Sequence, residues 1–488
     1  MYEEKAFILN IRGKKVMNVI IKGKIVFIPI EVKNREYKAK LLLANYFLQA
    51  GYSVCIGSLW HMDEFMVNAE DSVYITKDFY KYRFPFLDSL HRNRNFVVGW
   101  DEEGLIYDIE EEYVETSLNE NTLRAIDLII TWGKRQKNTI EKFLRNYTNQ
   151  ICALGNPRLD LLNFNIVTSA FSSEISYILK EFGSDYILVN SNFNIATRDD
   201  YDSKVAIISC NGESKRSIAF VERMNRLVNT LAPYFFSAIK TIATEFPEKK
   251  IVFRPHPAER LQDVEDIFKN YSNIYVVKKF SVNPWIACAS LVIHSGCTTG
   301  MEAAIMGKMA ISYQPNISLE YPITIPDQLS KVLNTEDELL SIISSMENKQ
   351  SSVLNNEQKS ILGNYVSFTN NETCSERIVK SIDKENKIGK FVFATPFLDI
   401  RKFVETSPFN VEFGSLSFSE FKKDLLSLKR AMSLHYKEKI LILTENVFFV
   451  VNKKSKVKYI YSFREIIYFA KRVVRKITRL TGCEFLFN

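Results

Sequence analysis

A run of small and hydroxyl-bearing residues between Leu291 and Gly307 has the composition of a phosphate-binding turn. The segment LVIHSGCTTGMEAAIMG places an apolar strand before a small-residue turn and a helical pattern after it. Small residues let a ligand approach the main chain, and the free N–H groups of a helix start favour an anion. A strand–turn–helix with an ordinary N-cap is the alternative. The residues that we expect to contact a nucleotide here are Ser295, Gly296, Thr298, Thr299 and Glu302.

Upstream of this turn, His256 stands between two prolines directly after a short apolar strand, in the segment IVFRPHP. A rigidly placed imidazole could donate to a phosphate or stabilise a leaving group. A loop histidine with a structural hydrogen bond is the alternative. Arg254 lies nearer the strand, where it could contact the nucleotide or serve as an internal ion-pair partner.

Two asparagines, Asn190 and Asn192, follow another apolar strand in the segment YILVNSNFN. Their amides suit the recognition of hydroxyls or phosphates, and asparagines that only form a turn are the alternative. Since ligands of parallel sheets lie beyond the carboxyl ends of the strands, we predict that both residues belong to the same nucleotide site.

Carboxylates follow two further apolar strands. The segment NFVVGWDEEG carries Glu102 and Glu103, either of which could be a general base or stabilise an oxocarbenium-like transition state. The segment GNPRLD carries Asp160, which could be the nucleophile of a retaining reaction. Acids that only solvate a loop are the alternative for the first segment, and a helix-terminus carboxylate is the alternative for Asp160.

Short β-rich runs that alternate with helical patterns must position these side chains. The expected strands are 24–30, 52–57, 72–76, 96–99, 127–132, 150–154, 185–190, 251–254, 274–277, 291–294 and 309–313. A long helical region over 215–246 is expected to break near Pro233. This alternation predicts βαβ units with parallel sheets.

The chain of 488 residues is longer than one hydrophobic core usually organises. We predict an α/β protein with two Rossmann-like, doubly wound domains that face a cleft, the GT-B arrangement, and a helical, basic C-terminal appendage. The expected boundaries are 1–165 for an acceptor domain, 166–388 for a nucleotide-sugar domain and 389–488 for the appendage.

Composition excludes several classes of protein. Apolar residues make up 46% and charged residues 25% of the chain, which is ordinary for a globular protein and argues against disorder. The seven cysteines are scattered without a CxxC pair, which favours reduced thiols over disulfides or a zinc site. No signal peptide and no apolar run of about 20 residues is visible, so we expect a cytoplasmic protein that does not span a bilayer.

The net charge of +7 is concentrated at the C-terminus. Residues 451–488 contain ten Lys or Arg and two Asp or Glu, so their net charge is +8 and that of the remaining residues is −1. This asymmetry argues against nucleic-acid binding by the whole protein. Residues 462–480 place apolar side chains at helical spacing opposite a basic face, which predicts attachment to an anionic membrane surface on the cytoplasmic side. Docking onto the protein itself or a partner is the alternative.

Together these segments resemble bacterial surface carbohydrate biosynthesis proteins of the GT-B type. That family includes retaining β-Kdo transferases and is more distantly similar to CDP-glycerol polymerases. The segments that carry the resemblance, in order over 25–315, are IPIEVKNREYKAKLLLA, WDEEG, TWG, GNPRLD, VNSNFN, RPHP and HSGCTTGMEA. Cys297 departs from the pattern, where a smaller or hydroxyl residue is expected.

The resemblance implies a transferase that builds a capsule, lipopolysaccharide or other surface polysaccharide from a CMP-activated 3-deoxy-ulosonic acid such as Kdo. It also implies catalysis by the carboxylates of WDEEG and GNPRLD, and an acceptor side formed by Glu31, Lys33 and Arg35. The acceptor would be a glycan or a lipid-linked glycan. Because CMP is its own leaving group, this chemistry needs no metal and no cofactor. The alternatives are a CDP-glycerol-type alditol phosphotransferase and a non-catalytic GT-B scaffold in polysaccharide assembly.

Overall fold

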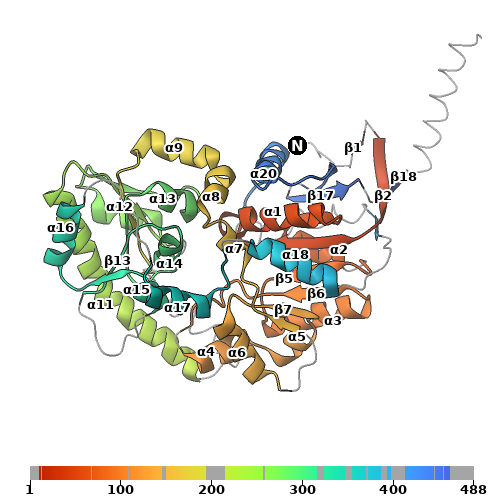
Figure 1. Ribbon diagram of the computed structural model, residues 1–488, viewed down its shortest axis with the longest axis horizontal. Coiled ribbons are helices and arrows are strands. Elements are labelled where there is room, and N and C mark those ends of the chain that lie inside the picture. Colours follow the sequence, from red (N-terminus) through yellow and green to blue (C-terminus); the bar gives the residue numbers. More distant parts are fainter. Residues whose placement is uncertain are drawn as a thin grey trace, which may run out of the picture.

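The computed structural model places most of the chain in two α/β domains that stand side by side (Figure 1). Each domain contains its own sheet of mainly parallel strands, which confirms the predicted fold class. The structure describes residues 10–11, 14–66, 69–107, 109–145, 150–193, 215–256, 259–315, 324–346, 354–369, 372–385, 393–396, 413–444, 446–453 and 456–461.

The first domain is built on an eight-stranded sheet in the order β16-β17-β4-β3-β5-β6-β7-β8. Its parallel strands are β3 (Ile25–Ile30), β4 (Ser53–Ser58), β5 (Val73–Thr76), β6 (Phe96–Gly99), β7 (Leu128–Ile130) and β8 (Gln150–Cys152). Alternate residues of β3 enter two different apolar clusters, so helices cover both faces of the sheet. The helices are α1 (Lys33–Gln49), α2 (Leu59–Met66), η1 (Lys81–Arg83), α3 (Phe84–Arg92), α4 (Glu110–Ser117), α5 (Glu120–Arg124) and α6 (Lys134–Phe143).

The second domain is built on a six-stranded, fully parallel sheet in the order β11-β10-β9-β12-β13-β14. Its strands are β9 (Ile187–Asn190), β10 (Ile251–Arg254), β11 (Ile274–Val276), β12 (Leu291–His294), β13 (Ala310–Tyr313) and β14 (Lys331–Leu333), the last of which the sequence did not reveal. The helices are α11 (Lys215–Glu245), α12 (Leu261–Phe268), α13 (Val282–Cys288), α14 (Thr298–Ile305), α15 (Ile325–Gln328), α16 (Glu336–Ser345) and α17 (Asn356–Tyr365). Helix α11 continues through Pro233 instead of breaking there, since Phe235 and Ile239 hold it against the core.

The described part of 389–488 does not form a separate appendage, contrary to our expectation. Strands β16 (Glu438–Thr444) and β17 (Val447–Asn452) extend the first sheet, where β17 pairs antiparallel with β4. Helix α20 (Phe418–Ala431) packs on α1, and Phe421 stacks on Phe448 with ring centroids 4.2 Å apart. Strand β17 is apolar and buried along its whole length. Packing in the first sheet removes its apolar side chains from water, which stabilises this position. The amphipathic segment 462–480 lies outside the described residues.

Helix α18 (Cys374–Glu385) also returns to the first domain, although the expected boundaries assign residues 166–388 to the second. In Figure 1 it lies beside α1. Its residues Ile378, Val379 and Ile382 are buried in the apolar cluster that contains α1. The link between the domains contains α7 (Pro157–Asp160), α8 (Phe164–Ala170) and α9 (Ser172–Phe182). A small antiparallel sheet is formed by β1 (Asn10–Ile11), β2 (Lys14–Lys22), β15 (Phe393–Pro396) and β18 (Lys456–Tyr461).

Candidate functional site

Three neighbouring strands bring the predicted nucleotide-binding segments to one edge of the second sheet. The strand register places Arg254 of β10 and His294 of β12 on either side of Asn190 of β9. Beyond the strands, the main-chain N–H of His256 donates to Ser191 Oγ at 3.1 Å. The histidine loop, the end of β9 and the turn after β12 therefore lie side by side, as the parallel topology predicted.

A buried histidine that we did not single out supports the turn before α14. The ring of His294 lies under the start of this helix, and a Cβ built on Gly300 would come within 2.1 Å of its Nε2. Its Nδ1 accepts from the Cys297 N–H at 3.3 Å, and its Nε2 is 2.8 Å from Ser330 Oγ. Complete burial lowers the pKa of His294 to about 4, so the ring is neutral near pH 7. The sequence signal was the small Gly300, since only glycine allows this contact.

Replacing His294 with glutamine is expected to weaken the dependence of stability on pH below neutrality. In the wild type, the unfolded chain takes up a proton at this ring below its ordinary pKa of about 6.5, whereas the folded chain does so only near 4. Stability is therefore lost as the pH falls through this window, by up to about 3 kcal/mol from this group. Urea titrations of both proteins at pH 7 and pH 5 measure the difference. Equal losses in the two proteins would contradict the buried, neutral ring.

Three buried polar atoms at this edge have no hydrogen-bond partner among the described residues. They are Asn190 Nδ2, Thr299 Oγ1 and Glu302 Oε2, on residues that are 4%, 8% and 9% exposed. Leaving such an atom unpaired costs about 1–3 kcal/mol, so each needs an explanation. Burial also raises the pKa of Glu302, which the nearby Arg158 lowers in part. A ligand with hydroxyl and phosphate groups would supply the missing partners.

The other residues that we predicted to bind the nucleotide lie at the same edge but differ in burial. Gly296 adopts a left-handed conformation with φ of 64°, which suits the tight turn. Ser295 is buried, with Oγ 3.5 Å from Gln314 Oε1, whereas Thr298 is exposed. Asn192 is half-buried beside the end of β9. All four residues therefore lie at the predicted edge of the second sheet.

Arg254 has a structural role in place of the nucleotide contact that we expected. Its guanidinium donates to the main-chain carbonyls of Lys279 and Phe280 at 2.7 and 2.9 Å. It also lies over the Trp285 ring, 5.5 Å from the centroid. Burial lowers its pKa to about 10, so it remains charged at neutral pH. Arg254 therefore fixes the loop before α13, which agrees better with the internal-partner alternative.

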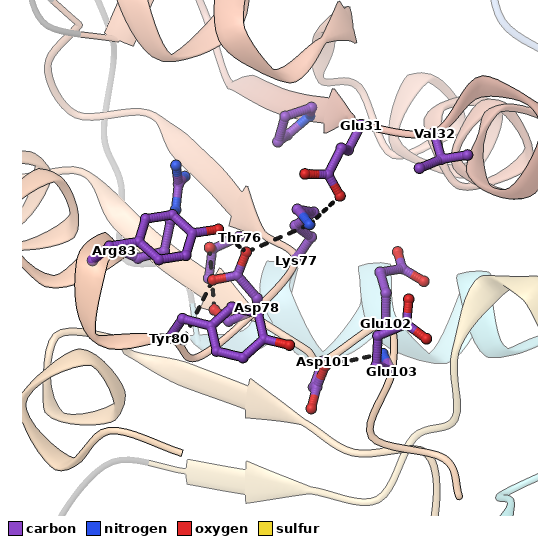
Figure 2. A network of polar contacts seen from close by, with 12 residues as sticks. Glu31, Val32, Thr76, Lys77, Asp78, Tyr80, Arg83, Asp101, Glu102 and Glu103 are labelled. Carbon is purple, nitrogen blue, oxygen red and sulfur yellow. Dashed lines mark hydrogen bonds and ion pairs between the residues drawn. The ribbon is translucent and has the colours of Figure 1, made fainter. Parts of the chain in front are cut away.

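The carboxyl edge of the first sheet carries a dense network of charges (Figure 2). Glu102 is 4% exposed and accepts from Trp100 Nε1 at 2.8 Å, while Lys40 Nζ lies 3.4 Å away. Glu103 on the same loop is different, because its side chain is 58% exposed and pairs with Arg35. Of the two predicted catalytic glutamates, Glu103 is the one that a substrate can reach. Beside them, burial raises the pKa of Asp101 to about 7.

The predicted acceptor-side residues divide between two places. Glu31 follows β3 and pairs with Lys77 (Figure 2). Arg35 at the start of α1 pairs with Glu103, so both residues belong to the charge network at this edge. Lys33 instead bonds to the main chain of Ser415 and lies 3.0 Å from Glu420 on α20. Lys33 therefore fixes the C-terminal segment against α1 and is not part of the acceptor network.

Asp160 caps a helix and is not available as a nucleophile. Its carboxylate accepts from Cys374 N at 2.6 Å, Ser375 N at 2.9 Å and Ser375 Oγ at 2.7 Å, all at the start of α18. Its side chain is 2% exposed. This is the helix-terminus role kept open above, although the helix concerned is α18 and not the adjacent α7, which Asn156 caps.

Arg158, the residue before Leu159 in the GNPRLD segment, joins the two sheet edges. Its Nη1 lies 3.4 Å from the main-chain oxygen of Glu102 in the first domain. Its Nη2 lies 3.5 Å from Glu302 Oε1 on α14 in the second. The acidic loop after β6 and the helix start after β12 therefore approach each other closely enough for one side chain to contact both.

No group of three or more His, Cys, Asp or Glu side chains in the described ranges is arranged to hold a metal ion. Among the helices that the structure describes, none is both long and apolar enough to cross a membrane. A cavity of about 380 Å³, lined by Lys38, Phe280 and Asp424 among others, lies between α1, α9 and α20.

Comparisons with known proteins show that this chain resembles solved structures in its fold. No protein-family model matches the chain, and no curated protein matches it in sequence. A UDP-GlcNAc 2-epimerase from Methanocaldococcus jannaschii is 14% identical, with a TM-score of 0.45 over 74% of this chain and 99% of that one. The same enzyme from Neisseria meningitidis, bound to UDP-GlcNAc, is 13% identical, with a TM-score of 0.43 over 74% and 100%. The wall teichoic acid polymerase TagF is 10% identical, with a TM-score of 0.46 over 75% and 89%. Identities of this size indicate nothing about substrate.

Proposed function

We propose that the protein is a transferase that binds a nucleotide-activated donor at the second sheet and passes its sugar to an acceptor at the first. The observation that carries the proposal is the set of buried, unpaired polar atoms on Asn190, Thr299 and Glu302. They lie at or just beyond the carboxyl ends of parallel strands, where such folds bind ligands. A second support is Arg158, which brings the donor edge next to the acid loop after β6.

In this proposal each group has a stated task. The N-terminus of α14 and the Thr299 hydroxyl bind the donor phosphate, and Glu302 accepts from the ribose hydroxyls. His256 donates to the phosphate that leaves. Glu103 takes the proton from the acceptor hydroxyl as its oxygen bonds to the anomeric carbon, and the bond from that carbon to the phosphate oxygen breaks. Because Asp160 caps α18, the transfer that we propose is a direct displacement without a covalent glycosyl–enzyme intermediate.

The donor that we propose is a CMP-linked ulosonic acid, on the basis of the sequence resemblance described above. The product is a surface polysaccharide or a lipid-linked precursor of one. Residues 462–480, with their basic and apolar faces, would hold the protein at the inner face of the cytoplasmic membrane, where a lipid-linked acceptor is found.

A donor-turnover assay tests the proposal. Purified protein is incubated with membranes from a producing strain and with CMP-Kdo, CDP-glycerol, UDP-GlcNAc or a GDP-sugar, and release of the nucleotide is measured. We expect acceptor-dependent release of CMP from CMP-Kdo. Turnover of CDP-glycerol alone would replace the proposal with alditol phosphate transfer. Absence of turnover with every donor, together with intact polymer in a strain carrying Glu103→Gln, would favour the scaffold.

A further inference from the structure

A pair of tyrosines, of which Tyr82 is exposed and Tyr80 is half-buried, follows β5 at the acceptor edge. Tyr80 and Tyr82 stack with ring centroids 5.9 Å apart and an angle of 22° between the rings. The side chain of Tyr82 is 58% exposed, although tyrosine rings usually bury most of their surface. We call Tyr80, Tyr82 and the Asp78 that holds them the tyrosine platform.

Hydrogen bonds from buried groups hold the tyrosine platform in place. Asp78 is 2% exposed and accepts from the Tyr82 hydroxyl at 3.1 Å and from Tyr80 N at 3.4 Å. Thr122 Oγ1 donates to the main-chain oxygen of Tyr80 at 3.0 Å. Lys77 lies 3.6 Å from Asp78. A rigid ring loses little entropy on binding, so this arrangement suits recognition.

The tyrosine platform adjoins the loop that carries Glu103. Strands β5 and β6 pair directly, and the N–H of Glu102 donates to Lys77 O at 3.1 Å. Burial raises the pKa of Tyr80, and the nearby Asp101 raises it further, followed by Asp78 and Glu103. Figure 2 shows Tyr80 between Asp78 and Asp101. A molecule resting on the platform would therefore lie beside the exposed carboxylate of Glu103.

The charges around the tyrosine platform disfavour an anionic ligand. Lys77 pairs with Glu31 and Asp78, and Arg35 pairs with Glu103 and Glu36. Next to the platform itself, Arg83 pairs with Asp63, and Lys81 between the two tyrosines is exposed. The charged groups around the platform are seven carboxyl groups and five cations. They are Glu31, Glu36, Asp63, Asp78, Asp101, Glu102 and Glu103 with Arg35, Lys40, Lys77, Lys81 and Arg83. Even with Asp101 protonated, the net charge is negative. An uncharged ligand avoids this repulsion.

We propose that the tyrosine platform binds an uncharged sugar ring at the end of the acceptor. The C–H face of the ring packs on Tyr82, and its hydroxyls lie beside Glu103 and Glu31, which accept hydrogen bonds. This inference rests on the proposed function, because it assigns the acceptor of that reaction. It further means that an acceptor ending in a phosphate or a uronic acid is excluded.

Direct titration calorimetry tests the acceptor without any donor. The probes are uncharged oligomers of glucose, galactose, mannose and N-acetylglucosamine, and anionic oligomers of galacturonic acid and glycerol phosphate. We expect at least one uncharged oligomer to bind, and every anionic oligomer to bind at least 10-fold more weakly. Tyr82→Ala should weaken the binding at least 10-fold, whereas Tyr234→Ala, at a 48% exposed tyrosine on α11, should not change it.

Three results would overturn the inference. They are tighter binding of an anionic oligomer, no binding of any uncharged oligomer, and equal affinity in the wild type and Tyr82→Ala. Thermal shifts with nucleotides, measured on the same two proteins, keep the inference separate from the proposed function. Tyr82→Ala should leave the nucleotide shift unchanged, and a wild type that binds sugar but no nucleotide would contradict only the donor assignment.

Discussion

Replacing Asp160 with alanine is expected to destabilise the protein by about 3 kcal/mol or more while the folded protein still binds nucleotide. The substitution leaves two main-chain N–H groups and the Ser375 hydroxyl without their acceptor at the buried start of α18. Each hydrogen bond to a charged group is worth about 1.5–3 kcal/mol, and the three are not additive. Since α18 packs on α1, the loss should appear in the unfolding of the first domain.

The control for this prediction is Asp160→Asn, which keeps one acceptor oxygen and should lose less stability than the alanine variant. Urea unfolding, a nucleotide thermal shift and donor turnover are measured on both. A catalytic nucleophile would give the opposite pattern, with normal stability and no turnover in either variant. That pattern would restore the role that the sequence suggested and remove the capping role.

Replacing Thr299 with valine should lower nucleotide affinity about 10-fold without loss of stability. The hydroxyl of Thr299 is buried with no partner among the described residues, so a methyl group of similar size removes an unpaired polar atom. Such exchanges are nearly neutral or stabilising in the free protein. With a ligand bound, the same exchange removes a hydrogen bond to phosphate, worth about 1.4 kcal/mol, which is tenfold in affinity.

The matched control is Thr139→Val in α6, at a threonine that is 1% exposed. Its hydroxyl is 2.9 Å from Tyr107 OH and donates to Arg135 O at 3.2 Å. This variant should lose stability and keep its nucleotide affinity, the reverse of Thr299→Val. Calorimetric titration and urea unfolding of both variants measure the two quantities. A destabilised Thr299→Val with unchanged affinity would mean that its hydroxyl has a structural task.

The second-domain edge could be predicted from sequence because local patterns determine it. Apolar runs such as 251–254 and 291–294 are typical buried parallel strands, and parallel topology then brings their carboxyl ends together. The small residue Gly300 indicated close contact, but its partner His294 could not be identified, since it was read as the end of a strand. The unpaired state of Asn190, Thr299 and Glu302 also depends on every neighbour and has no local signal.

Contacts between distant parts of the chain escaped prediction for the same reason. Asp160 meets Ser375 across 215 residues, and neither segment alone indicates the other. Strand β17 pairs with β4 although an entire domain separates them in sequence, so the C-terminal segment could only be described by its charge. The tyrosine platform was missed because two tyrosines on a loop have no pattern until Asp78 and Glu103 are seen beside them.

The most direct test of the central claim is a crystal structure of the protein grown with CMP or CDP. We predict that the phosphate lies at the start of α14, within hydrogen-bond distance of Thr299 Oγ1, and that the ribose hydroxyls face Glu302. A nucleotide bound in the cavity beside Lys38, or anywhere else away from the carboxyl edge of the second sheet, would contradict the account.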